Sequence, residues 1–462
     1  MPTTDRHHGE RALPLSLWMV VCGFAAAYAI SALVRHWRFD SSYDLAIYDQ
    51  AVWHLSRFEP PASSIRGMTN LFGDHFHPVI ALFAPLFWIA PAAETLLAAQ
   101  AVLLALSIVP VFIYARDRLP DGIALAMAIA YGLFWGMQQT AVFDVHEAAF
   151  APLAVASLLL AMDRKAWRWF YVAAVAVATV KEDLTPFLMC VGAYLWLRGE
   201  RWRGGALLVT SLAAFMVIVG LVIPAASDAG GYGYRGTYAD ALEHPWNIPL
   251  SLVSPPIKML TMFLWVAPFA LLPLASPLSV LLAPFAIERF LSSSDHHWGT
   301  IFHYSAPLAP LVAMAGADGL ARLTARLQSS LSRARTRAAL AGACVLLSAL
   351  LPGHQPLWRL FSPSLYRFGA LERAGRQALA VVPANASVVA QVNVAPHLSH
   401  RDSLYQLTPD APPADYVIAV EGRSTWPVAS FPEIRALLDE RQRQGYRVAF
   451  EQDGWIVLRR AR

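Results

Sequence analysis

Long apolar runs separated by short polar loops dominate the first three quarters of the chain. A helix needs about 20 apolar residues to cross a bilayer, and shorter runs cross only where the bilayer thins or neighbouring protein covers their ends. The pattern predicts eleven membrane spans, several of them short. They cover residues 13–34, 93–115, 121–142, 148–162, 167–180, 184–197, 205–224, 257–273, 276–290, 301–319 and 338–353.

One further apolar stretch, residues 78–90, is short and contains Pro85. Loops rich in Lys and Arg favour the cytoplasmic side, and this rule decides the position of the stretch. If it crosses, most of the later arginines are exported; if it lies at the interface, the basic loops share the cytoplasm. These loops are Arg116/Arg118, Arg164/Lys165/Arg168, Arg198/Arg201/Arg203 and Arg322 to Arg337. We therefore predict an interfacial segment and a cytoplasmic N-terminus.

The pattern changes at about residue 354. Helix-like text (FGALERAGRQALAVV and FPEIRALLDERQRQ) alternates with β-rich runs, and Asp453-Gly454 is a hairpin signal between YRVAFEQ and GWIVLRR. The predicted fold class is mostly α: a polytopic transmembrane helical bundle over residues 1–353, with a small α/β domain over 354–462. An odd number of spans from a cytoplasmic start makes this domain extracytoplasmic.

Composition supports a membrane location. Hydrophobic residues make up 56% of the 462 residues and charged residues only 15%, against about 25% charged in soluble proteins. The net charge of +4 resides in short loops, which indicates topology signals and not nucleic-acid binding. The three cysteines lie in apolar runs without zinc-site spacing, and no Walker loop, G-x-S-x-G or H-E-x-x-H motif occurs.

Candidate chemistry begins in the first predicted outer loop. Apolar residues at helical spacing between Ser42 and Phe58 predict an amphipathic helix at about 42–58 that lies on the membrane surface, with Tyr48 and Trp53 in the headgroup zone. Asp44 falls in its first turn, where the helix dipole favours a carboxylate. Such a residue can cap the helix or act in catalysis.

Further polar clusters share the predicted outer face. Lys181 and its two acidic neighbours interrupt an apolar stretch, where charges are costly unless water or partners satisfy them. Lys181, Arg289 and the histidines can bind phosphate, and Asp44, Asp74 and His75 are candidate ligands for a divalent metal such as Mg or Mn. The candidate substrate- or phosphate-binding residues are Asp49, Asp74, His75, His77, Asp144, His146, Glu147, Lys181, Glu182, Asp183, Arg289, His303 and Tyr304.

The order of these motifs resembles a membrane family known as domain of unknown function 2079. Its motifs Y-D-L-x-x-x-D-Q, G-D-H-F-x-P, D-x-H-E, K-E-D and H-Y-x-A match residues 43–50, 73–78, 144–147, 181–183 and 303–306. The phrase Pro396-His397-Leu398-Ser399, followed by Arg401 and Tyr405, is also similar to that family. The likeness covers nearly the whole chain.

That family in turn resembles the GT-C glycosyltransferases, which have many spans and a catalytic Asp on a juxtamembrane helix of the first outer loop. The resemblance implies a bacterial-type inner-membrane enzyme. It would transfer a sugar from a polyprenyl-phosphate donor in the lipid to an extracytoplasmic acceptor, with Asp44 as the catalytic base. Two other functions remain open: a transporter or flippase of a lipid-linked or small polar substrate, and a non-catalytic membrane scaffold.

Overall fold

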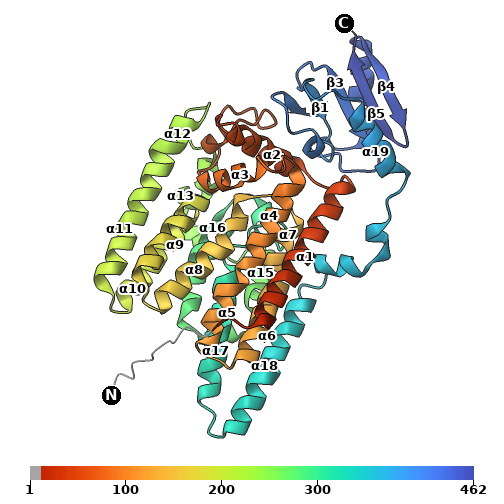
Figure 1. Cartoon of the computed structure of the whole chain (residues 1–462). Coiled ribbons are helices and arrows are strands. Elements are labelled where there is room, and N and C mark those ends of the chain that lie inside the picture. Colours follow the sequence, from red (N-terminus) through yellow and green to blue (C-terminus); the bar gives the residue numbers. More distant parts are fainter. Residues whose placement is uncertain (1–11, 462) are drawn as a thin grey trace.

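The computed structural model describes residues 12–461, and most of them form helices around an apolar core, with a small sheet at the C-terminal end (Figure 1). The helices of the bundle pack against one another in chain order over much of its width. They are α1 (Leu15–Trp37), α4 (Ala93–Leu106), α5 (Ile108–Arg116), α6 (Asp121–Leu133), α7 (Trp135–Val142), α8 (Ala151–Asp163), α9 (Trp167–Val180), α10 (Leu184–Leu197), α11 (Arg201–Val217), α12 (Ile223–Ala226), α15 (Ile257–Val266), α16 (Ala283–Leu291), α17 (Ala309–Ala325) and α18 (Ser330–Leu350).

Three of these helical stretches are long and apolar enough to cross a membrane. They are Leu15–Trp37, Ala93–Arg116 and Arg201–Ala226. The second joins α4 to α5, and the third joins α11 to α12 through a π-helical turn. Apolar helices of 10–17 residues fill the space between them, among them α6, α9 and α10.

Several predicted spans are interrupted or begin later than expected. The run 121–142 breaks at Phe134, whose extended backbone separates α6 from α7. The run 257–273 ends in 3₁₀ turns, with Ala270 and Leu271 at positive φ. The helix expected from residue 301 begins at Ala309, with a proline in its first turn. Prolines lie at the second and third of these breaks, where they remove a backbone donor and disfavour helix at the residue before, whereas the run 121–142 contains no proline.

The apolar stretch at 78–90 forms the 3₁₀ helix η2 (Pro78–Phe83) and the single turn α3 (Ala84–Phe87). Together they span ten residues, about half of what a crossing helix needs. Val79, Ile80 and Phe83 are buried against the same core as α2 (Tyr43–Ser56). The segment therefore closes one end of the bundle.

The C-terminal region contains a five-stranded mixed sheet in the order β2-β1-β3-β5-β4. The strands are β1 (Val388–Ala390), β2 (Leu404–Gln406), β3 (Tyr416–Val420), β4 (Tyr446–Gln452) and β5 (Trp455–Arg460), and the covering helices are α19 (Ala370–Ala380) and α20 (Phe431–Arg443). Asp453 and Gly454 both have positive φ, as the two-residue turn between β4 and β5 requires.

Helix α2 lies between the end of the bundle and this sheet (Figure 1). Ser42 caps its start, as expected. Its side chains are mostly buried within the protein, and Tyr48 is 7% exposed. The Tyr43 hydroxyl donates to the Ala390 carbonyl over 2.8 Å, and Gln50 Nε2 donates to the Arg401 carbonyl over 2.6 Å. The apolar spacing in α2 therefore serves packing against the C-terminal region.

Candidate active site

The start of α2 is held by a buried ion pair. Asp144, in the loop after α7, is fully buried and accepts a 2.7 Å hydrogen bond from Arg35 at the end of α1. Its other oxygen accepts from the Ser42 backbone N–H over 2.7 Å and from the Ser42 hydroxyl. A carboxylate at a helix N-terminus is stabilised by the helix dipole. Ser42 and Asp144 therefore cap α2 together, which leaves the carboxylate of Asp44 free for other contacts.

A series of charged side chains leads from Asp44 into the bundle. The Asp44 side chain is 40% exposed, and its Oδ2 lies 3.7 Å from His146 Nε2. His146 Nδ1 lies 3.5 Å from Glu147 Oε2, and Glu147 Oε1 lies 3.6 Å from Lys181 Nζ. Lys181 also lies 3.6 Å from Asp183, and the Tyr48 hydroxyl donates to Glu147. Opposite charges alternate along this series.

Each group in this series stabilises the charged form of its neighbours. Burial disfavours a charged His146, but Asp44 and Glu147 outweigh it and raise the pKa of the imidazole to about 9. Burial also opposes the charge of Lys181, yet the three carboxylates around it raise its pKa well above the usual value. For Glu147, Lys181 and His146 overcome burial and hold the pKa of the carboxyl well below its usual range. His146, Glu147 and Lys181 are therefore all charged at neutral pH.

A cavity with about 540 Å³ of empty space, partly open, lies beside Lys181. Its polar lining comes from Glu147, Lys181, Asp183, Glu288, His303 and Tyr304. The apolar lining comes mainly from α10 and α16, where the rings of Phe187 and Phe285 meet with centroids 5.0 Å apart. The cavity can therefore take a ligand that has both a charged and an apolar part.

A second polar cluster adjoins this cavity. His75 Nδ1 lies 2.6 Å from Glu182 Oε1, and the Phe76 backbone N–H donates to the other oxygen of Glu182 over 2.9 Å. Burial opposes the charge of Glu182, but His75 and Lys181 lower its pKa to about 2. Asp74 accepts hydrogen bonds of 2.9 and 3.0 Å from Arg66.

Three residues predicted to bind substrate have other partners. The Arg289 guanidinium is buried and donates to the carbonyls of His297 and Gly299 and to the Ser305 hydroxyl over 2.7–2.8 Å. Arg289 therefore fixes the loop that brings His303 and Tyr304 to the cavity. Asp49 accepts from the Ser399 hydroxyl and lies 3.0 Å from His400 Nε2, so it joins α2 to the C-terminal region. Asp144 belongs to the cap described above.

His77 is buried beside the rings of Tyr48 and Phe72. Burial lowers its pKa to about 4, so it is neutral at pH 7. Its neighbours indicate a role in packing.

Several residues of the site were not predicted from sequence. Tyr48 was assigned to the headgroup zone, yet it donates to Glu147. Tyr232, Tyr234 and Tyr238 approach the acidic residues from the loop after α12, and Tyr238 does so at Glu288, the neighbour of Arg289 that lines the cavity. That loop has no apolar period, and only its unusual content of Gly and Tyr signals a special role.

The predicted metal ligands Asp44, Asp74 and His75 are divided between the two clusters, as their partners show. A different set, His146, Glu147 and His303, offers three ligand atoms within 4.8 Å of one another, and all three residues are buried. Two imidazoles and a carboxylate suit zinc better than the magnesium or manganese expected from sequence. The rings of His146 and His303 stack with centroids 3.9 Å apart.

The fold of this membrane protein is similar to that of the GT-C glycosyltransferases. It combines a helical bundle, the carboxylate-bearing helix α2 after α1, and a small C-terminal sheet. The crystal structure of ArnT from Cupriavidus metallidurans bound to undecaprenyl phosphate matches with a TM-score of 0.56 and 12% identity, over 96% of this chain and 98% of that chain. The apo oligosaccharyltransferase of Archaeoglobus fulgidus matches with a TM-score of 0.51 and 13% identity, over 87% and 69%. Identities this low show the fold alone.

The chain belongs to the membrane-protein family described as "Predicted membrane protein (DUF2079)", whose model matches residues 35–457. The family resemblance inferred from the motifs is thereby confirmed. The comparison with curated proteins finds no sequence match.

Proposed function

We propose that the protein is a membrane glycosyltransferase that transfers a sugar from a polyprenyl-phosphate-linked donor to an extracytoplasmic acceptor. The observation that carries this proposal is the series Asp44–His146–Glu147–Lys181, which joins a partly exposed carboxylate to a cation in a cavity with an apolar wall. The likeness to the ArnT structure, which contains undecaprenyl phosphate, is a second support.

In the proposed reaction, Lys181 binds the donor phosphate, and the wall formed by α10 and α16 receives the first prenyl units. Asp44 accepts the proton of an acceptor hydroxyl while that oxygen forms a bond to the anomeric carbon of the sugar. The bond from the anomeric carbon to the phosphate oxygen breaks, and its electron pair leaves with the polyprenyl phosphate. Lys181 balances the charge of this leaving group. His146 orients Asp44, and Glu147 holds both cations in place.

The proposal includes an orientation in a bacterial-type inner membrane. The cytoplasm receives the N-terminus and the loops with most arginines, and the eleven-span topology predicted from sequence puts the C-terminal sheet outside. Lys165, between α8 and α9, has a side chain that is 69% exposed. In a cysteine-free background, Lys165→Cys should react with an impermeant thiol reagent only after the cell is opened. Labelling from outside intact cells would contradict this orientation.

Binding of undecaprenyl phosphate to the full chain in nanodiscs tests the core of the proposal. Lys181→Ala should weaken binding by about tenfold to a hundredfold, the effect of losing a hydrogen bond to a charged group. Lys165→Ala, at the opposite end of the bundle, is the matched control and should bind like the wild type. Lys181→Arg keeps a positive charge beside Glu147 and should retain most of the affinity.

Native mass spectrometry, with detergent removed in the gas phase, counts the bound lipid directly. Equal binding by the wild type and Lys181→Ala, with both variants folded, would remove Lys181 as the phosphate ligand. Transport of the lipid across vesicle membranes without any sugar release would favour the flippase alternative instead.

A further inference from the structure

A glycine- and tyrosine-rich strap, Gly230–Tyr238, lies beside the two polar clusters, after α12. The Tyr232 hydroxyl donates to Glu182 Oε1 over 3.2 Å, and the Tyr234 hydroxyl donates to Asp74 Oδ1 over 3.0 Å. The Tyr238 hydroxyl interacts with Glu288 of the cavity lining. Each strap tyrosine therefore contacts a different carboxylate, and all three lie close enough to Lys181 to interact with its charge.

The hydrogen bonds from the Tyr232 and Tyr234 hydroxyls are longer than is usual between a hydroxyl and a carboxylate. A hydroxyl that donates to a carboxylate usually approaches to about 2.5–2.7 Å, whereas the Tyr232 and Tyr234 bonds are longer. Glu182 also has His75 and a backbone N–H as partners, and Asp74 also has Arg66. The tyrosines thus occupy the remaining acceptor positions of these carboxylates without holding them tightly.

The strap is held at both ends, since its base packs on the G-D-H-F-H-P motif and the Thr237 carbonyl accepts a 2.9 Å hydrogen bond from the Ser293 backbone N–H, whereas the glycines between have open space beside them. Asp228 accepts hydrogen bonds of 2.9 and 2.5 Å from Thr69, and a Cβ on Gly73 would stand 2.5 Å from the Ala226 carbonyl oxygen. The G-D-H-F-H-P motif thus needs its glycine because the end of α12 packs on it. By contrast, a Cβ on Gly231, Gly233 or Gly236 would meet no atom within 4 Å, and none of these three has a positive φ.

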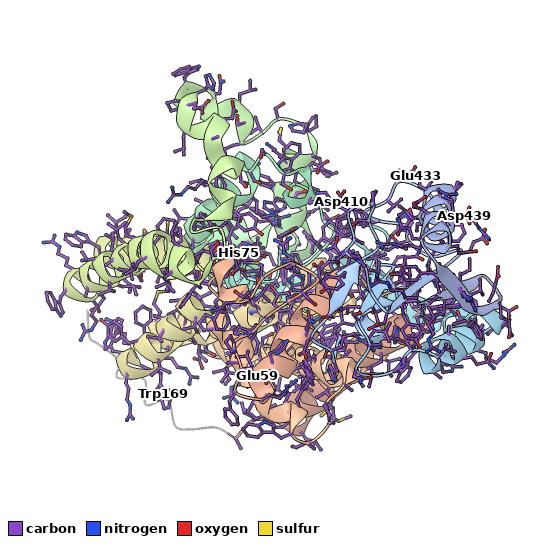
Figure 2. All side chains as sticks on the ribbon, turned by 90° about the horizontal axis from the view of Figure 1, so that it is seen from above. Glu59, His75, Trp169, Asp410, Glu433 and Asp439 are labelled. Carbon is purple, nitrogen blue, oxygen red and sulfur yellow. The ribbon has the colours of Figure 1, made fainter. Side chains whose placement is uncertain are left out.

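Neither packing nor turn geometry requires those three glycines, so conformational freedom is the property they supply. Burial raises the pKa of Tyr232 and Tyr234, so both hydroxyls stay protonated as donors. A sugar hydroxyl can bind to a protein in the same way, because it is also neutral and donates a hydrogen bond to a carboxylate. The Tyr234 ring stacks on His75, which is labelled near the centre of Figure 2, with centroids 4.3 Å apart.

We propose that the strap hydroxyls occupy the places of the donor sugar's hydroxyl groups, and that the sugar displaces the strap when the donor binds. Glu182, Asp74 and Glu288 then form a subsite for a neutral, polyhydroxylated sugar beside the phosphate at Lys181. This inference rests on the proposed function, because Lys181 must first hold the lipid phosphate.

The test compares two lipids on the full chain in nanodiscs: bare undecaprenyl phosphate, and undecaprenyl phosphate carrying glucose, mannose or galactose. The triple variant Tyr232→Phe, Tyr234→Phe, Tyr238→Phe keeps every ring, including the stack on His75. It removes only the competing hydroxyls. The ratio of the two affinities should shift by about tenfold toward at least one hexosyl lipid, roughly the worth of one to two hydrogen bonds. Tyr366→Phe, outside the strap, is the matched control.

The direction in which the affinity ratio changes distinguishes displacement of the strap from a merely structural role of its tyrosines. An unchanged or lowered ratio for all three hexoses would overturn the inference, even if bare lipid still binds. Failure of the wild type to bind bare lipid would instead refute the proposed function, and the inference with it. A second variant, Gly231→Ala with Gly233→Ala and Gly236→Ala, should slow association of the preferred hexosyl lipid several-fold and leave that of bare lipid unchanged. Equal association rates in this variant and the wild type would also count against displacement of the strap.

Discussion

Both ends of the helical bundle carry charged residues but hold some of them differently. At the hairpin end, where α17 joins α18, the bonds are short: Arg164 binds Asp117 through two bonds of 2.8 and 3.0 Å, and Arg322 binds Asp318 over 2.6 Å (Figure 1). At the α2 end, which carries α2 and the C-terminal sheet, the series from Asp44 to Lys181 is spaced at 3.5–3.7 Å.

Short pairs occur at the α2 end too, as between Arg35 and Asp144 (2.7 Å) and between His75 and Glu182 (2.6 Å). The wider spacing therefore distinguishes the series from Asp44 to Lys181 and not the whole end. A short two-bond contact between Arg and a carboxylate uses the donors and acceptors of both partners, so little remains for a ligand. Glu147, in contrast, serves three neighbours, and Asp44 keeps part of its carboxylate exposed. Buried groups with incomplete hydrogen bonding are costly unless a ligand or water completes them. A substrate therefore gains most binding free energy at the α2 end.

The largest effect expected is on catalysis at the α2 end. Asp44→Asn keeps the shape of the side chain but removes the proposed base, so sugar release should fall by about 10²–10⁴-fold. The assay is slow hydrolysis of labelled undecaprenyl-phosphate hexoses with water as acceptor, which needs no knowledge of the natural acceptor. Binding of bare undecaprenyl phosphate should stay unchanged, because Lys181 is intact.

The matched control for that experiment is Asp295→Asn. The Asp295 side chain is 77% exposed, in the loop between α16 and α17. Its substitution should leave hydrolysis unaltered. If Asp44→Asn releases sugar at the wild-type rate, the catalytic base lies elsewhere. The distinction between the charges of the two ends is then weakened.

The second prediction concerns the support of Asp44. Asp144→Ala leaves Arg35 without its partner and removes part of the cap of α2, so the free energy of unfolding should fall by about 3 kcal/mol. SDS-induced unfolding in mixed micelles measures the loss. The variant should also lose sugar release, because α2 no longer presents Asp44 in register. Full stability of Asp144→Ala would show that the C-terminal contacts of α2 suffice.

Much of the site was within reach of sequence analysis, because the order of helices determines which loops share an end. Asp44, His146, Lys181 and His303 lie up to 259 residues apart in the chain, yet each follows or precedes a helix at the same end of the bundle. Alternation of spans and the positive-inside rule were enough to group them. The GT-C-like fold was expected from the many spans and from the position of Asp44 in the first outer loop, and the structural neighbours agree with it.

The directions in which the side chains point could not be predicted from the sequence. Arg289 was expected to bind phosphate because its type suits that task, but the broken helices around Pro284 and Pro307 bring carbonyl oxygens to its guanidinium. The strap was missed because hydrogen bonds from tyrosines in a loop leave no periodic pattern. The strand β2 was also missed.

The third prediction uses pH to probe the link between Asp44 and Glu147. The pKa of His146 is raised from 6.5 to about 9 by the two carboxylates. A raised pKa means that the folded protein holds this proton more tightly than the unfolded chain. The stabilisation is therefore complete below pH 6.5 and is lost as the pH rises toward 9. The free energy of unfolding should decline over that interval, and His146→Gln should reduce the decline.

Unfolding curves at several pH values between 6 and 10 provide the measurement. Asp117→Asn, at the hairpin end, is the reference variant and should keep the wild-type slope, because no histidine contributes to its pair with Arg164. An identical slope in His146→Gln and the wild type would show that His146 is not the group that titrates.

The smallest effect is expected at the hairpin end. Asp117→Asn breaks both bonds to Arg164, but the pair is close to solvent, and such pairs contribute about 1 kcal/mol or less. Added salt should shrink even this difference, because exposed charges are screened. Sugar release should be unaffected, since Asp117 belongs to the tightly paired charges and not to the series that leads to Lys181. A large loss of activity in Asp117→Asn would mean that the two ends are coupled through the bundle, and the tightly paired charges of the hairpin end would then have a part in the reaction.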